Sequence, residues 1–127
     1  MPSLTLEVLA RVQNERPQIE DDQWGEVESR LVLEDALPEE ALDEIDSFSH
    51  VEVVFLFHKV PDAKIVKGAR HPRNNTDWPK VGILAQRGKN RPNRIGLTIA
   101  RVVRREGRSL VVAGLDAIDG TPILDIK

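Results

Sequence analysis

The stretch that decides the fold is GLTIARVVRREGRSLVVAGL, residues 96–115. Two apolar runs rich in β-branched residues, 96–103 and 109–115, flank the polar sequence Arg105-Glu106-Gly107-Arg108. A glycine in a short polar interval between two strand-like runs is typical of a β-hairpin. The stretch therefore predicts two antiparallel strands joined by a tight turn.

Two earlier segments also have the composition of strands. Residues 25–33 alternate, with Val27, Leu31 and Leu33 on one face and charged residues on the other, which predicts a half-buried strand. Residues 51–57 are apolar almost throughout, which predicts a strand buried on both sides.

Three shorter runs complete the set of expected strands, at residues 4–12, 81–85 and 122–126. The pair Asp119-Gly120 before the last of them predicts a second hairpin turn. Residues 38–45, with Pro38 and acidic residues in the first turn, predict the one helix. Short, closely spaced strands with one minor helix indicate an all-β barrel or sandwich.

The composition bounds the class of protein. A chain of 127 residues predicts a single domain, residues 1–127, and its lack of cysteine excludes disulfides, thiolate metal sites and cysteine nucleophiles. The first residues lack the pattern of a signal peptide, and no apolar run has membrane-spanning length. We therefore expect a soluble, cytoplasmic protein without membrane contact.

Charge is divided unequally along the chain. Residues 1–58 contain 3 Lys and Arg against 15 Asp and Glu, whereas residues 59–127 contain 15 against 6. One interpretation is a basic face for a polyanion beside an acidic face. The equally weighted alternative is that the two halves pair with each other, within the chain or across a dimer.

Polar residues that suit a binding site concentrate in the second half. Residues 61–80 form a long basic loop, and Arg87, Arg91, Asn93 and Arg94 follow it; Arg and Asn suit phosphates and nucleobase edges. By the residues alone a solvated basic loop is favoured about two to one for that cluster, and plain turn chemistry for Asp116 and Asp119. The candidate substrate-binding residues are Lys64, Arg70, Arg73, Arg91, Asn93 and Arg94.

Several site types are disfavoured by their missing motifs. There is no Rossmann fingerprint, P-loop or H-E-x-x-H, and the three histidines do not have metal-ligand spacing, so no metal is expected. Only Trp24 and Trp78 lie in loop-like settings where an indole can stack on a base or an adenine ring. This scarcity disfavours a generic single-strand-binding barrel.

Five segments together resemble the TsaA/VirR-like family, whose characterised members are TrmO-type tRNA methyltransferases. The segments are Phe48-Ser49-His50, Phe55-Leu56-Phe57-His58, Gly82-Ile83-Leu84-Ala85-Gln86-Arg87, Arg91-Pro92-Asn93-Arg94-Ile95-Gly96, and residues 116–127. The family pattern is F-S-H, F-H at a strand end, G-hydrophobic-F-A-x-R, R-P-N-P-I-G, and a final D-x-x-D-G-T-P-hydrophobic-x-D-I-K-P-Y, whose last Pro-Tyr is missing here. The match covers nearly the whole chain.

The resemblance implies a single TsaA-like domain: a small closed or nearly closed antiparallel β-barrel that binds S-adenosylmethionine and works as a homodimer. It implies N6-methylation of threonylcarbamoyl-adenosine next to the tRNA anticodon. By their positions in the family motifs, the implied cofactor contacts are His58, Lys59, Arg87, Leu97, Ala113, Gly114, Leu115 and Asp116. Asp116 is also the candidate catalytic residue, as a carboxylate near the sulfonium or the ribose.

Two other functions stay open: a non-catalytic RNA-binding barrel, and a methyltransferase of the same fold with a small-molecule substrate. Three departures from the family pattern bear on them. Arg94 replaces a proline and Gly88-Lys89 replace Ser-Pro, so we expect a looser, more basic loop. The sequence stops at Lys127, without the C-terminal extension that longer members use to hold tRNA.

Overall fold

The computed structural model describes residues 2–14 and 27–127, and consists mostly of strands. The strands are β1 (Ala10–Gln13), β2 (Glu28–Leu33), β3 (His50–Leu56), β4 (Ala69–Arg70), β5 (Val81–Gly82), β6 (Ile95–Glu106), β7 (Ser109–Ala113) and β8 (Pro122–Ile126). The 3-10 helices are η1 (Glu39–Leu42), η2 (Ile45–Ser47), η3 (Asp62–Lys64), η4 (Pro72–Asn74), η5 (Ile83–Ala85) and η6 (Pro92–Arg94). No helix in these ranges is long and apolar enough to cross a membrane.

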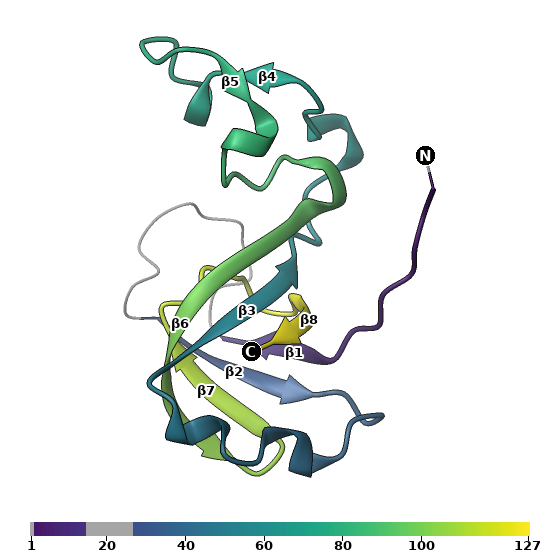
Figure 1. Ribbon diagram of the computed structural model, residues 1–127, viewed down its shortest axis with the longest axis vertical. Coiled ribbons are helices and arrows are strands. Elements are labelled where there is room, and N and C mark those ends of the chain that lie inside the picture. Colours follow the sequence, from purple (N-terminus) through teal and green to yellow (C-terminus); the bar gives the residue numbers. More distant parts are fainter. Residues whose placement is uncertain (1, 15–26) are drawn as a thin grey trace.

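Six of these strands form a closed antiparallel barrel in the order β1-β2-β7-β6-β3-β8 (Figure 1). The predicted hairpin is its β6–β7 pair, with Glu106 opposite Ser109 and Gly107 at a φ of 58° in the turn. A positive φ is accessible to glycine at little cost, which explains its place in the turn. The expected all-β barrel is therefore confirmed.

The structure corrects three expectations about individual strands. In β3 only one face is buried, because a closed antiparallel barrel covers the inward side chains and leaves Glu52 exposed. β1 begins only at Ala10, where it pairs with β2 and β8, and Leu4 is 80% exposed. Asp119-Gly120 is a turn but not a hairpin, since β8 pairs with β1 and β3 rather than with β7.

The expected helix at residues 38–45 appears as the 3-10 turns η1 and η2. Asp43 is extended between them, with φ −57° and ψ 132°, so the segment does not continue as one α-helix. Leu42 is buried and joins the barrel core with Phe55, Leu115 and Ile123. Of the expected strand at residues 81–85, only β5 forms, and it pairs with β4 in a separate two-stranded sheet.

The charged halves of the chain are arranged along the long axis. Residues 59–94 form a lobe beyond one end of the barrel, whereas η1 and η2 lie across the other end (Figure 1). This basic lobe, as we call residues 59–94, carries ten Lys and Arg against two Asp. At the far end, residues 34–47 carry seven acidic residues and no Lys or Arg.

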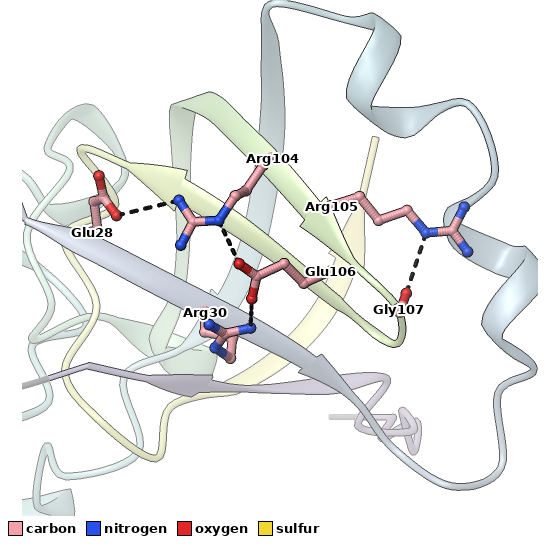
Figure 2. Close-up of polar contacts among 6 residues, drawn as sticks. All are labelled: Glu28, Arg30, Arg104, Arg105, Glu106 and Gly107. Atoms are coloured by element: carbon pink, nitrogen blue, oxygen red, sulfur yellow. Dashed lines mark hydrogen bonds and ion pairs between the residues drawn. The ribbon is translucent and has the colours of Figure 1, made fainter.

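Ion pairs nevertheless join the two halves of the sequence around the β6–β7 hairpin. Arg105 contacts Asp43 at 2.8 Å. Glu106 contacts both Arg104 and Arg30, as Figure 2 shows. These contacts depress the pKa of the Glu106 carboxyl through hydrogen bonds from Arg104 and then Arg30. Both interpretations of the charge division are thus partly realised: the hairpin cations pair with acids, and the lobe cations lie at the opposite end.

We predict that Gly96→Ala destabilises the barrel. A Cβ atom at Gly96 would lie 2.6 Å from Cζ of Phe55 and 2.9 Å from Cζ of Phe57, and Phe55 is held in the core. Overpacking of this kind costs about 1–3 kcal/mol of unfolding free energy, measurable by urea denaturation. Gly82→Ala is the matched control, because nothing lies within 4 Å of its Cβ position. Equal stability of the two variants would contradict the prediction.

Candidate cofactor and substrate site

A cavity of about 280 Å³ lies where the barrel meets the basic lobe. Its walls come from the end of β3, the segment between β7 and β8, and two parts of the lobe. The lining residues are Phe55, Phe57, His58, Lys59, Val60, Arg70, Arg73, Arg87, Gly88, Lys89, Asp116, Ala117, Ile118 and Thr121. One carboxylate among several cations makes this a cavity for a polar ligand that carries at least one negative group.

A more open groove of about 660 Å³ adjoins the cavity. It runs along the first half of β6 and reaches η5, with Leu97 and Ile99 among its lining residues. Phe55, Phe57, Arg87 and Asp116 line both hollows. The two hollows therefore adjoin each other, and the wall that they share carries one cation and one anion.

Arg87 and Asp116 are each oriented by a contact to β6. The Arg87 guanidinium Nη2 donates a hydrogen bond to the Leu97 carbonyl at 2.8 Å. The Asp116 carboxylate Oδ1 accepts a hydrogen bond from the Thr98 hydroxyl. Because both partners lie on one rigid strand, the two charged groups are held in a defined relation to each other.

His58 follows β3 and packs over the turn before β8, where a Cβ at Gly120 would lie 3.8 Å from its Nε2 atom. Its Nδ1 atom is buried and has no hydrogen-bond partner of normal geometry in the described part of the chain. Burial lowers the pKa of His58 below its ordinary 6.5, and the charges of Lys59 and Arg11 lower it further. A backbone interaction with Leu56 raises the pKa and offsets part of this shift. The imidazole is therefore neutral at pH 7.

Not every residue implied by the family motifs faces these hollows. Ala113 and Leu115 are buried in the core region, 5% and 0% exposed, and Gly114 lies between them with a φ of 83°. None of the three lines the cavity or the groove, whereas His58, Lys59, Arg87, Leu97 and Asp116 each line one or both.

The candidate substrate residues divide in a similar way. Arg70 and Arg73 line the cavity and Arg91 lines the groove, whereas Lys64, Asn93 and Arg94 line neither. Arg91 Nη1 also donates to the Gln86 carbonyl at 2.5 Å.

Arg94, which stands where the family pattern has proline, makes contacts with its side chain and its main chain. Its guanidinium meets Asp62, its N–H donates to the Arg91 carbonyl at 3.1 Å, and its carbonyl accepts the Phe57 N–H at 2.8 Å. Proline cannot adopt the φ of 52° found at Arg94, so the backbone of this turn differs from that of a turn with proline at this position.

Sequence reasoning missed three residues that shape the site. Lys89 and Thr121 line the cavity, and the buried Thr121 hydroxyl donates to the Ile118 carbonyl at 2.6 Å. Gln86 bridges β4 and β5, because its Nε2 donates to the carbonyls of Arg70 and Val81 at 3.2 and 3.1 Å. Thr121 and Gln86 lie inside the quoted family motifs, which marked their positions in the sequence but could not predict which residues they contact.

No group of three or more acidic or histidine side chains in residues 2–14 and 27–127 is placed to hold a metal ion. The arrangement can instead bind an organic ligand through charge and shape. Arg87 and Lys89 suit a carboxylate, Asp116 suits a cation or a ribose hydroxyl, and Phe57 offers an aromatic surface.

Comparison with known proteins gives a consistent result. A family model described as the tRNA-methyltransferase O N-terminal domain matches residues 12–127. The tRNA (adenine(37)-N6)-methyltransferases of mouse and human are 42% and 41% identical over 90 residues, which are 71% of this chain and 20% of each relative. A protein of Rhizobium radiobacter named "probable S-adenosyl-L-methionine-binding protein VirR" is 39% identical over 88 residues, 68% of this chain and 47% of that protein.

Solved structures show the same fold. Two crystal structures of TrmO from Pseudomonas aeruginosa match with TM-scores of 0.74 and 0.71 at 25% identity, covering 100% and 99% of this chain. The chain spans 55% of those crystallised chains and about a fifth of the mouse and human relatives. Since the family model covers nearly all of the sequence, this chain belongs to the tRNA-methyltransferase O N-terminal domain family.

Proposed function

We propose that this protein binds S-adenosylmethionine in the cavity between barrel and lobe and methylates N6 of threonylcarbamoyl-adenosine next to a tRNA anticodon. The observation that carries the proposal is that His58, Arg87 and Asp116, which come from three separate family motifs, line one cavity. The whole chain would act as one domain, because the cavity takes residues from both barrel and lobe. The names of the mouse and human relatives agree with this chemistry.

The residues present fit this cofactor. When bound, S-adenosylmethionine supplies an electrophilic methyl group on a positively charged sulfur. Arg87 and Lys89 would bind its carboxylate, and Asp116 would stabilise positive charge or hold the ribose. Neutral His58 adds no positive charge to a cavity that already contains several cations. Catalysis would rest on positioning and electrostatics, since methyl transfer needs no protein nucleophile.

The basic lobe supports tRNA as the methyl acceptor. Five of its ten Lys and Arg line the cavity, namely Lys59, Arg70, Arg73, Arg87 and Lys89. The acidic segment 34–47 lies at the opposite end of the barrel. A polyanion would therefore be attracted to the cavity end and repelled from the other. A non-catalytic RNA-binding barrel would need the lobe but not the cavity, which is why the methyltransferase is favoured.

We expect S-adenosylmethionine to bind saturably in calorimetric titration, and Arg87→Ala or Asp116→Asn to weaken binding about 10- to 100-fold. A hydrogen bond to a charged group contributes about 1.5–3 kcal/mol, and each 1.4 kcal/mol is tenfold. Asp116→Asn preserves the shape and an acceptor for Thr98, so it isolates the carboxylate charge. Arg101→Ala is the matched control, being an exposed arginine of β6 outside both hollows.

A second experiment, transfer of a labelled methyl group from S-adenosylmethionine, identifies the acceptor. Incorporation into tRNA, lost in Arg87→Ala and kept in Arg101→Ala, is the expected result. Cofactor binding with transfer only to a small nucleoside would favour the small-molecule alternative. Binding of tRNA without any cofactor binding would favour the non-catalytic barrel.

We also predict that S-adenosylmethionine affinity falls as the pH falls below about 6.5, toward the depressed pKa of His58. Protonation there adds a cation that repels the sulfonium, so the ligand that carries positive sulfur binds best while His58 is neutral. S-adenosylhomocysteine, whose sulfur is uncharged, should show a smaller pH effect. His58→Gln should flatten the profile for both ligands, and an unchanged slope in that variant would refute the role of His58.

We propose further that two copies of the chain pair through the outer face of β6. Ile95, Leu97 and Ile99 are 37%, 42% and 66% exposed on this face, and Leu84 beside them is 81% exposed. An apolar stripe of this kind marks an interaction surface, and it is continuous with the wall formed by Arg87 and Asp116.

Sedimentation velocity tests the pairing. The wild type should sediment as a dimer at micromolar concentration and Ile99→Lys as a monomer, because a lysine there places charge in the apolar contact. Leu4→Lys, at a leucine that is 80% exposed elsewhere on the chain, should remain dimeric. A monomeric wild type would overturn the pairing.

A further inference from the structure

The connection between β4 and β5, residues 71–80, presents an exposed tryptophan. Ala69 pairs with Gly82 and Arg70 with Val81, so the connection is a hairpin loop of ten residues. Trp78 lies near its end and is 47% exposed. One exposed aromatic side chain needs no explanation by itself. In a lobe dominated by cations, however, the indole of Trp78 is placed where a ligand with an aromatic part and negative charge could contact it.

The backbone around Trp78 is held on both sides. His71 Nδ1–H donates to the Trp78 carbonyl at 2.8 Å, and the Trp78 N–H donates to the Asn75 carbonyl at 3.2 Å. The Asn75 side chain in turn accepts the Asp77 N–H at 2.9 Å. The main chain of Trp78 is thus bound to His71 and Asn75, which precede it in the loop. Because the loop is already ordered, less conformational entropy is lost when a ligand contacts the indole.

Two further features fix the loop relative to the cavity. Gln86 ties the two strands at the loop's base through the carbonyls of Arg70 and Val81. Arg73 has a φ of 53° and lines the cavity, although it lies in the same loop as Trp78. A left-handed arginine costs free energy, and such strain is commonly kept where it places a side chain at a functional site.

Trp78 itself lines neither the cavity nor the groove. The adenine of a cofactor bound in the cavity is therefore not its partner. The partner must lie outside the cavity, beside the loop, and must tolerate the positive charge of the lobe. An unpaired nucleobase on a phosphate backbone meets both conditions, since single-stranded RNA is bound by cations along the backbone and by stacking on aromatic side chains.

We propose that the indole of Trp78 is a stacking platform for an unpaired RNA base next to the nucleotide that enters the cavity. The proposal rests on the proposed function for the identity of the RNA, an anticodon loop. Arg73 at the cavity and Trp78 further along the same loop would contact neighbouring nucleotides. The stacked base contributes affinity with little dependence on its identity, because every base offers an aromatic face.

The test uses tryptophan fluorescence with an anticodon stem-loop RNA. The chain contains two tryptophans, so Trp24→Phe leaves Trp78 as the only reporter. The emission of Trp78 is also obtained as the difference between the wild type and Trp78→Phe, which leaves Trp24 unaltered. Stem-loop RNA should quench Trp78, whereas S-adenosylmethionine alone and a fully paired duplex should not.

Affinity supplies the second readout. Trp78→Ala should weaken stem-loop binding about 5- to 100-fold, the range that corresponds to loss of one stacked base, and Trp78→Phe should restore most of it. Phe48→Ala is the matched control, since Phe48 is an exposed aromatic residue, 64% exposed, beside the acidic end of the barrel. Its variant should bind the stem-loop as the wild type does.

The outcomes separate this proposal from the proposed function. Unquenched Trp78 with unchanged affinity in Trp78→Ala overturns the platform, even if cofactor binding and methyl transfer are intact. Quenching by S-adenosylmethionine alone also overturns it, because the stacked ring would then belong to the cofactor. Quenching by RNA in a protein that binds no cofactor supports the platform while the methyltransferase function fails.

Discussion

Closure of the barrel through β8 is the constraint on which the rest of this structure depends. β8 pairs with β1 on one side and β3 on the other, and so joins the two edges of the sheet. To reach that place the chain must turn at Gly120, whose φ of 82° suits glycine, and the buried Thr121 hydroxyl closes the turn on the Ile118 carbonyl. Closure also removes the exposed strand edges that would otherwise invite aggregation. The same closure sets the end of β3, with His58, against the segment that carries Asp116, so the cavity is a consequence of how the barrel closes.

The charges follow the same architecture. Cations of the β6–β7 hairpin are bound at the far end of the barrel. Arg105 forms an ion pair with Asp43, whereas Arg108 donates to the main-chain carbonyls of Glu34 and Leu37 at 2.8 and 2.7 Å. Exposed ion pairs of this kind each contribute at most about 1 kcal/mol, so they adjust the hairpin rather than hold the barrel together. The cations of the basic lobe lie at the opposite end, next to the cavity. The unequal division of charge along the sequence therefore supplies partners for the hairpin cations and a cationic lobe next to the cavity. The net charge of −3 reveals neither.

Much of the fold and part of the site could be predicted from local patterns. Turn chemistry at Gly107 and the apolar run of residues 122–126 identified the β6–β7 hairpin and β8, because these features depend on neighbouring residues. Burial of β3 was predicted wrongly, since an apolar run does not reveal that its second face would remain uncovered on the outside of a barrel. Lys89 and Thr121 were missed as lining residues for a related reason. They reach the cavity only because the fold places them beside residues that are far away in the sequence.

By itself the sequence determined the all-β class, the central hairpin, the segregation of charge and the family motifs. These are properties of composition, period and short-range turn geometry, which the covalent chain carries wherever it folds. Only the tertiary structure decided that His58, Arg87 and Asp116 share one cavity, that Arg94 is held by Asp62, and that Trp78 stands exposed outside that cavity. The physical reason is that these relations depend on strand order and register, and pairing between strands distant in sequence is specified by packing of the whole barrel rather than by any one segment.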